Sequence, residues 1–425
     1  MIEDVREIRL PVSFFRENRQ KLFRCLPEKV LVVLYAGRAT IMSADTEYPF
    51  FANRNFYYFA GIEQEESILL LYRDGDAIRE VIFVQTQDPL KERWTGKRLT
   101  YDEVVAASGI AEVHFLPTFE DYMKPYLSDT ELPIALEEGS KSGPCKEFEK
   151  QIRSLDDERE MISLEKICAR IRMVKEPCEL DMIREAIRLT YEATKETCAH
   201  IRPGVTELEL TSAFDYALAK RGCRVSAFPP IFAAAKNALC LHHMNPTGIA
   251  NAGDLIQMDV GGRVAGLCAD ISRVYPASGK FDERQLALYA AVRSLQETAF
   301  RTIKPGVTLS EVNEATKKAA RDLLIPLGLL DTGTESHKDV TNYYWHNVSH
   351  HMGHDVHDVS LRELPLEAGM VITVEPGLYV EEWMTGFRIE DDVVVTANGC
   401  ELLSDFFPRE ADEMCSMTES AEGGE

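Results

Sequence analysis

The chain has 425 residues, of which 45% are hydrophobic and 28% charged, and its formal net charge is −23. This length favours two domains over a single core, and the composition is typical of a globular protein rather than a disordered one. The acidic charge argues against nucleic acid as a partner, because phosphate backbones require a basic surface. No apolar run approaches the ~20 residues that a membrane span needs.

The start of the chain and its cysteines indicate a cellular compartment. The first ten residues have mixed charge and lack the apolar core of a signal peptide. Ten cysteines are scattered singly, with no CxxC pair. In a chain of this size they are expected to be reduced thiols. We therefore expect a cytoplasmic protein without a membrane association.

Residues 1–160 are predicted to form an α/β domain. A helix-like stretch at 13–26 precedes three apolar, strand-like runs, which lie at 30–37, 67–73 and 80–85.

Three further segments complete the predicted organisation. Residues 161–174 are charged and are expected to form a helical connector. Residues 175–409 would be the second domain, which an amphipathic helix opens after Pro177. Residues 410–425 carry six acids and no base, so a disordered tail is predicted.

The second domain contains an internal repeat. The motif Ile-Arg-Pro-Gly-Val-Thr at 201–206 returns as Ile-Lys-Pro-Gly-Val-Thr at 303–308, and helix-like stretches flank both copies. The Pro-Gly pair interrupts the chain, and the threonine is suited to cap the next helix. Matching flanks, with an acidic pair downstream of each copy, favour a duplication.

Each half supplies two acids on strand-like sequence. Asp259 and Asp270 lie in the first half, on strands that we expect a Gly261–Gly262 turn to join as a hairpin. Glu375 and Glu390 lie in the second half, where a longer excursion separates the strands. Two such hairpins would direct two acids each at a shared centre.

These four carboxylates and His350 predict a dinuclear metal site. Acids in apolar, β-branched runs are costly to bury as ions without a compensating positive charge. Four carboxylates balance two divalent ions, which they bridge at ~3.5–4 Å, and a hydroxide between the ions would then be the nucleophile. Oxygen and imidazole ligands favour Mn²⁺ or Co²⁺, with Zn²⁺ or Fe²⁺ also suited. Cys268 lies two residues before Asp270, and its spacing leaves both a packing role and a ligand role open.

Histidines gather in the same region. Five of the ten lie between 346 and 357, and His242 and His243 precede Asp259. This density exceeds what structural histidines account for.

The ordered motifs resemble the pita-bread metallopeptidases, and most closely the aminopeptidase P/prolidase branch. They are LHH at 241, MDVGG at 258, ADISRVYP at 269, SHHMGHDVHD at 349, TVEPG at 373 and RIEDDVVVT at 388. The N-terminal segments NRNFYYFAGIEQEESILLL and ERWTGKRLTYDEV are also similar to that branch. The resemblance implies an α/β N-terminal creatinase-like domain and an α+β pita-bread catalytic domain with an internal pseudo-two-fold repeat.

The resemblance also implies roles for the metal ligands. Asp259 would bind one ion, His350 and Glu375 the other, and Asp270 and Glu390 would bridge both. Glu375 would in addition act as the general base.

Four further residues would act on the substrate. His242 would contact it and His357 would hold the scissile carbonyl, so both count as catalytic. His346 would lie near the proline side, and Arg388 would support the acids and the substrate end.

The implied activity is hydrolysis of the Xaa-Pro bond at the N-terminus of a peptide, by a homodimer or homotetramer. A prolidase restricted to Xaa-Pro dipeptides, a creatinase-like amidinohydrolase and a non-catalytic peptide-binding protein are alternatives. The ligands match the family, whereas His243, His351 and His354 depart from its common pattern. Since they surround the predicted substrate side, we expect them to affect subsite preference.

Overall fold

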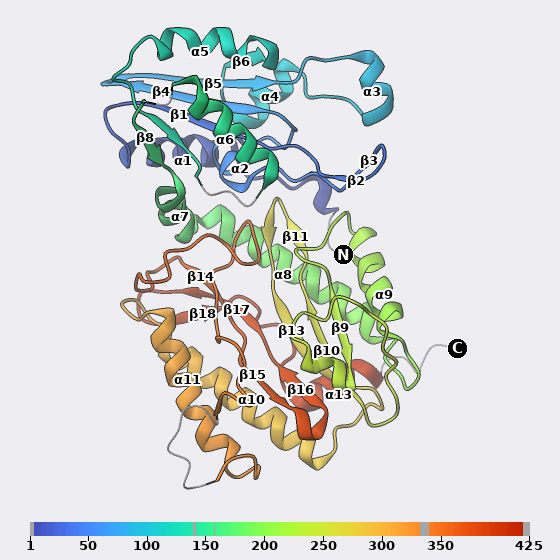
Figure 1. The fold of residues 1–425 in the computed structure, drawn as a ribbon. Coiled ribbons are helices and arrows are strands. Elements are labelled where there is room, and N and C mark those ends of the chain that lie inside the picture. The colour runs from blue at the N-terminus through green and yellow to red at the C-terminus, as the bar shows by residue number, and fades with distance from the viewer. Residues whose placement is uncertain (1–3, 139–141, 157, 332–339, 420–425) are drawn as a thin grey trace. The chain divides into compact units, whose positions relative to one another are not determined.

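The structure, a computed structural model, describes residues 4–138, 142–156, 158–331 and 340–419. It divides into two compact units (Figure 1). The N-terminal unit is Leu10–Arg172, and the C-terminal unit comprises the described residues from 173 onwards together with residues 4–9.

The N-terminal unit is an α/β domain, as predicted. Its elements in chain order are α1 (Val12–Arg24), β1 (Lys29–Tyr35), β2 (Ile41–Ser43), β3 (Thr46–Glu47), α2 (Arg54–Ala60), β4 (Ile68–Asp74), β5 (Ala77–Val84), α3 (Pro89–Thr95), α4 (Tyr101–Ser108), β6 (Glu112–Phe115), α5 (Phe119–Leu127), β7 (Ile134–Leu136), α6 (Gly143–Leu155), β8 (Met161–Ser163) and α7 (Glu165–Met173).

A mixed six-stranded sheet of order β6-β5-β4-β1-β7-β8 forms the centre of this unit. The three predicted apolar runs are its central strands β1, β4 and β5. Phe119, Met123 and Ile152, from α5 and α6, pack in one core with residues of these strands. Figure 1 shows α1 and α2 on the opposite side of the sheet from α5. Helices on both faces explain why these strands are continuously apolar rather than alternating.

The C-terminal unit contains the repeat. Its elements are α8 (Pro177–Cys198), α9 (Glu207–Ala219), β9 (Ile231–Ala234), the 3₁₀ helix η3 (Ala235–Leu239), β10 (Leu255–Val260), β11 (Arg263–Val264), β12 (Leu267–Cys268), β13 (Ile271–Pro276), α10 (Glu283–Thr302), α11 (Leu309–Leu324), β14 (Val371–Val374), β15 (Gly377–Val380), β16 (Thr385–Arg388), β17 (Asp391–Val395), β18 (Cys400–Leu402) and α13 (Ala411–Glu419).

The two halves of this unit have the same order of elements. In the first half α8 and α9 precede the sheet β13-β10-β9, and in the second α10 and α11 precede β14-β17-β18. Both predicted threonine caps are confirmed. Thr206 Oγ1 accepts a hydrogen bond from Glu209 N at 3.1 Å, and Thr308 Oγ1 accepts one from Glu311 N at 3.2 Å.

The first hairpin forms, but its predicted turn is wrong. β10 and β13 pair antiparallel, and the chain reverses at Ala265–Gly266, between β11 and β12, where φ is +48° and +87°. A Cβ on Gly261 would lie 1.9 Å from Ala269 O. Gly261 is therefore where two chain segments cross closely, and not where the chain reverses. In the second half β14 pairs with β17, and the hairpin β15–β16 forms the longer excursion.

The ends of the predicted segments differ from the structure. Residues 161–163 are not a connector helix, because they form β8 and pair with β7 in the N-terminal sheet. Residues 4–9 pack with the C-terminal unit, where Val5 N donates to Arg221 O at 3.1 Å. The division after Arg172 falls near the end of α7.

The predicted disorder of the tail is wrong for residues 411–419. These form α13, which packs on β13. Met414 is buried, and Tyr275 Oη lies 3.9 Å from Met417 Sδ. The apolar residues lie between the acids at helical spacing, so an acidic composition concealed an amphipathic helix. Residues 420–425 lie outside the described residues.

Across the described ranges, no helix combines the length and the apolar character that a membrane span requires.

Candidate metal centre

All five predicted ligands lie in a strand or directly beside one. Asp259 is in β10, and Asp270 immediately precedes β13. Glu375 immediately follows β14, and Glu390 immediately precedes β17. The carbonyl of His350 accepts a hydrogen bond from the backbone of β14. Two paired hairpins and one adjoining segment therefore position the whole set.

Hydrogen bonds from two backbone amides join the two hairpins. Glu390 N donates to Ser272 O at 3.1 Å, and Arg388 N donates to Gln257 Oε1 at 2.7 Å. Each bond links β13 or β10 of the first half to the end of β16 or the start of β17 in the second half. The acids of both halves are consequently held at one centre.

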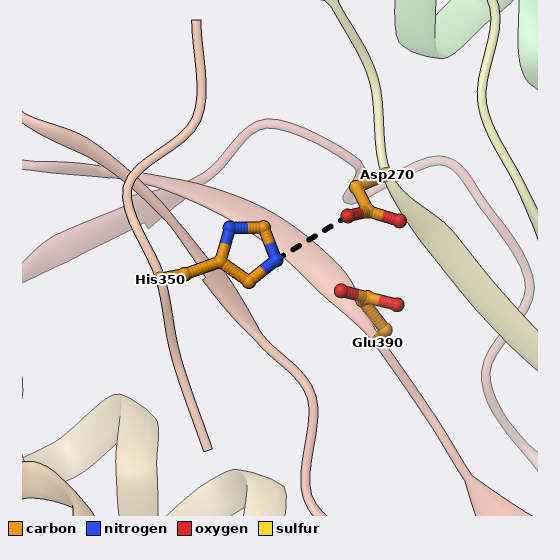
Figure 2. A group of neighbouring side chains, drawn as sticks. All are labelled: Asp270, His350 and Glu390. Atoms are coloured by element: carbon orange, nitrogen blue, oxygen red, sulfur yellow. Dashed lines mark ion pairs between the residues drawn. The ribbon is translucent and has the colours of Figure 1, made fainter. Parts of the chain in front are cut away.

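Three of the predicted ligands form a compact group. Asp270, His350 and Glu390 each present a ligand atom within 4.8 Å of the other two (Figure 2). His350 Nε2 lies 3.4 Å from both Asp270 Oδ2 and Glu375 Oε1, so Glu375 adjoins this group. Cys268 turns to another contact, since its Sγ lies 3.7 Å from His354 O.

Asp259 is held by an arginine. Arg388 Nη2 donates to Asp259 Oδ2 at 2.6 Å, and the same guanidinium donates to Ser272 Oγ and Tyr379 Oη at 3.0 Å. Asp259 Oδ1 is buried and has no hydrogen-bond partner among the residues that the structure describes. An unpaired buried carboxylate oxygen beside three other acids is a suitable ligand for a cation.

The carboxylates repel one another in a buried setting. Burial, followed by the neighbouring acids, raises the pKa of Asp270 and of Glu390 well above the usual range. Burial raises the pKa of Glu375 to about 8, against the opposing effect of Arg388. Divalent cations would restore the ionised forms, because they supply the positive charge that the surroundings lack. The residues present therefore fit a centre for divalent metal.

His350 is prepared as a neutral ligand. Burial and the nearby His357 lower its pKa to about 3. Its Nδ1 lies 3.1 Å from His351 O, and since a carbonyl can only accept, Nδ1 carries the proton. The lone pair is then on Nε2, which faces Asp270 and Glu375.

The acids open onto a cavity of about 530 Å³, a size typical of small-molecule and peptide sites. Every predicted site residue lines it. The full lining is Phe228, Pro229, Ile231, Leu241, His242, Met244, Asp259, Asp270, His346, Asn347, Ser349, His350, Val356, His357, Arg362, Glu375, Arg388 and Glu390.

The histidines that face the cavity are fixed by different contacts. His357 packs edge-on against His350 with ring centroids 4.2 Å apart. His346 Nε2 lies 2.8 Å from Tyr379 Oη, and its Nδ1 lies 3.6 Å from Glu375 Oε2. Tyr379 thus connects His346 with Arg388. Sequence reasoning missed this tyrosine, for which only its place four residues after Glu375 was a signal.

The acidic run 390–392 divides its tasks. Glu390 lines the cavity, whereas Asp391 forms a buried ion pair with Arg273 at 2.8 Å. Asp392 Oδ2 accepts a hydrogen bond from Asp270 N at 3.1 Å. Asp391 and Asp392 therefore stabilise the backbone around Asp270 and Glu390, the two acids that line the cavity.

The three histidines that depart from the family pattern are absent from the lining of this cavity. His243 Nε2 lies 2.8 Å from Glu207 Oε2, and His354 Nε2 lies 3.7 Å from Glu179 Oε1. His351 is 3% exposed, and burial lowers its pKa to about 4. They therefore do not border the cavity as predicted, and their effect on subsite preference stays a prediction.

Comparison with known proteins covers both units. Residues 181–397 match metallopeptidase family M24, and residues 15–134 match the N-terminal domain of aminopeptidase P. The Xaa-Pro aminopeptidase 3 of Mus musculus is 31% identical, over 91% of this chain and 81% of its own length.

Solved structures are similar over nearly the full length. Aminopeptidase PepP of Pseudomonas aeruginosa matches with a TM-score of 0.91 and 28% identity, covering 98% of this chain and 100% of its own. Aminopeptidase P of Escherichia coli, solved with the inhibitor Pro-Leu, matches with a TM-score of 0.88 and 27% identity over the same shares. These structures bear out the predicted creatinase-like and pita-bread domains.

Proposed function

The chain belongs to metallopeptidase family M24, and from this membership we propose that it is a dinuclear Xaa-Pro aminopeptidase, which removes the residue preceding proline at the N-terminus of a peptide. The observation that carries the proposal is the cavity. It joins the compact Asp270–His350–Glu390 group to a wall formed by His242, His346 and His357.

Five side chains would hold the metal, which we propose to be a pair of Mn²⁺ ions. Asp270 and Glu390, which directly precede β13 and β17 in equivalent positions, would hold it together with Asp259, His350 and Glu375. Bound divalent ions would supply the nucleophile by lowering the pKa of water held between them.

Glu375 is the proposed proton acceptor. It lines the cavity, and its Oε1 lies 3.4 Å from His350 Nε2 of the compact group, so its carboxylate would be placed to accept a proton from water at the metal site. Thr373 Oγ1 donates to Glu375 Oε1 at 3.3 Å and so orients one of its two oxygens.

His242 and His357 are proposed to hold the scissile carbonyl. Both line the cavity, and burial, followed by His242, lowers the pKa of His357, so a neutral ring donates through one nitrogen. Donors fixed before the reaction stabilise the oxyanion without reorganising. His346 would lie near the proline side of the substrate, and Arg388 would support the acids and the substrate end.

A preference for proline follows from the imide bond. Proline has no backbone N–H, so modes of binding that use this donor are unavailable and the ring must be held by shape. The cavity offers such walls in Phe228, Ile231 and Val356.

The test offers the Mn²⁺-loaded protein Ala-Pro-Ala and Ala-Pro together and identifies the products by mass spectrometry. Release of alanine from the tripeptide, leaving Pro-Ala, is the expected result. Cleavage of the dipeptide alone would instead make the protein a prolidase. Failure to cleave either peptide with metal bound would overturn the proposal. Asp270→Asn protein, which should lack metal, is the matched control.

We also propose that the protein acts in the cytoplasm. None of the ten cysteines, all of which lie in described parts of the chain, forms a disulfide, and this fits the reducing conditions of that compartment.

A further inference from the structure

A single buried carboxylate collects four hydrogen bonds beside the cavity. Glu207 is the first residue of α9, and it is 1% exposed. Its Oε1 accepts from Ala234 N at 2.7 Å and from Asn237 Nδ2 at 2.8 Å. Its Oε2 accepts from Gly248 N at 2.7 Å and contacts His243 Nε2 at 2.8 Å.

These donors span one segment, residues 234–248, which we call the histidine loop. Ala234 and Gly248 are its two ends, and Asn237 and His243 lie within it. One carboxylate therefore closes the loop and also fixes its interior. The loop carries Leu241, His242 and Met244, all of which line the cavity.

The anchor is closely packed. A Cβ on Gly248 would lie 2.5 Å from Glu207 Oε1 and 2.6 Å from Asn237 Nδ2, so the loop end has no room for a side chain. Glu207 N also donates to Gly248 O at 3.0 Å. The carboxylate lies at the N-terminus of a helix, where the dipole favours negative charge. Although burial opposes ionisation, the hydrogen bonds lower the pKa of Glu207.

His242 and His243 are neighbours with different surroundings. His243 is directed at Glu207, whereas His242 lines the cavity and is exposed. Any rotation of the loop that frees His243 from Glu207 must also move His242. His243, which departs from the family pattern, thus affects the position of His242, which keeps that pattern.

We propose that Glu207 and His243 are positioning residues, which hold the histidine loop so that His242 meets the substrate. The inference rests on the proposed function for the role of His242, but the anchoring itself does not. Displacing a substrate contact by about 1 Å can cost on the order of 10²-fold in rate.

The experiment compares four variants and one control variant with the wild-type protein. Glu207→Gln keeps the shape but replaces one accepting oxygen by a donor, and His243→Phe removes the histidine donor. His242→Ala removes the positioned residue, and Glu207→Gln/His242→Ala combines both changes. His114→Phe is the matched control, because His114 Nε2 contacts Glu112 Oε1 at 3.0 Å in the N-terminal unit.

The first readout needs no activity. Lys236 is the one lysine or arginine between Arg224 and Arg263, so trypsin cleavage there reports opening of the histidine loop. We expect faster cleavage after Lys236 in Glu207→Gln and His243→Phe, and an unchanged rate in His114→Phe. If the rate of cleavage after Lys236 were unchanged in both Glu207→Gln and His243→Phe, the proposal that these residues hold the histidine loop would be overturned.

The second readout is kcat and KM on Ala-Pro-Ala with Mn²⁺. Glu207→Gln should lower kcat about 10- to 100-fold when His242 is present and leave it nearly unchanged in the His242→Ala background. Equal losses in both backgrounds would indicate a general loss of structure and overturn the positioning role. If Glu207→Gln does not fold, the milder His243→Phe is measured instead, alone and combined with His242→Ala, and the same comparison decides.

If the wild-type protein binds Mn²⁺ but leaves Ala-Pro-Ala intact, the proposed function is refuted. The role of Glu207 in positioning His242 for that reaction is then refuted as well. The trypsin result would still decide whether Glu207 holds the loop. The two failures are thereby distinguished.

Discussion

The two hairpins of the C-terminal unit have the same strand pairing, but their acidic residues do not all occupy equivalent positions. In each hairpin, one pair of residues is the last to be paired before the two strands separate. This pair is Val260↔Ile271 between β10 and β13, and Val374↔Asp391 between β14 and β17. On the returning strands the preceding residues are Asp270 and Glu390, which are therefore equivalent. On the outgoing strands the next residues are Gly261 and Glu375, which are not.

The reason for this difference is steric. Because a Cβ on Gly261 would meet Ala269 O at 1.9 Å, no carboxylate can occupy that place in the first half. The acid is supplied two residues earlier by Asp259, which by strand alternation points to the same side. The symmetry between the two halves thus includes Asp270 and Glu390 but does not include Asp259 and Glu375.

The largest expected effect tests the equivalent pair. Asp270→Asn and Glu390→Gln should each remove one or both metal ions and lower turnover by on the order of 10³-fold or more, since metal supplies several kcal/mol of charge stabilisation. Metal content by elemental mass spectrometry and turnover on Ala-Pro-Ala measure this. Loss of metal in one variant with full retention in the other would show that the two halves are not equivalent.

Substitutions of His350 and His357, which both lie in the second half, should distinguish effects on metal binding from effects on catalysis. His357→Ala should keep its metal and lower turnover about 10²- to 10³-fold, as loss of an oxyanion donor does. His350→Ala, whose ring lies 4.2 Å away, should lose metal as well as activity. Unchanged turnover in His357→Ala would contradict the role given to this residue.

The pH dependence of stability should report the burial of Glu375, to which the nearby Asp259 of the first half adds a smaller effect. The pKa of Glu375 in the folded protein, about 8, exceeds the ordinary value of 4.5. Its contribution is therefore fully present below pH 4.5 and is lost as pH rises towards 8. Mn²⁺ relieves this loss, so the rise in Tm on adding it should be larger at pH 8 than at pH 6. Calorimetry measures both shifts, and an equal rise at the two pH values would contradict a raised pKa.

The smallest expected effect compares the two threonine caps. Thr206→Ala and Thr308→Ala should each destabilise the first turn of their helices by about 1 kcal/mol. Hydrogen exchange at the amides of Glu209 and Glu311 measures this loss. Turnover should not change in Thr308→Ala, and a loss confined to one helix would break the equivalence of the repeats.

Features that depend on local chemistry could be predicted from the sequence. Apolar runs marked the strands β1, β4 and β5, and the Pro-Gly-Val-Thr repeats marked the helix caps. The acids were found because charge in apolar, β-branched sequence demands compensation. The predicted site residues were accordingly those that the fold brings to one cavity.

Features that depend on distant contacts could not be predicted. The role of Gly261 depends on how closely Ala269 approaches, and nothing in its sequence context distinguishes a crossing from a turn. The helix at 411–419 depends on burial of Met414 against a strand far earlier in the chain. The histidine motif at 242–243 likewise gave no sign that one ring faces a cavity and the next a buried glutamate.

The contact of Val5 with Arg221 has a consequence for the order of synthesis. Val5 is made before the N-terminal unit and Arg221 after it. Ribosomes add about 5–20 residues per second, so the partner arrives on the order of 10–40 s later. The N-terminal unit can complete its own sheet in that interval, whereas residues 4–9 must wait unpaired. The C-terminal unit is thus the last part of the chain able to reach its final state.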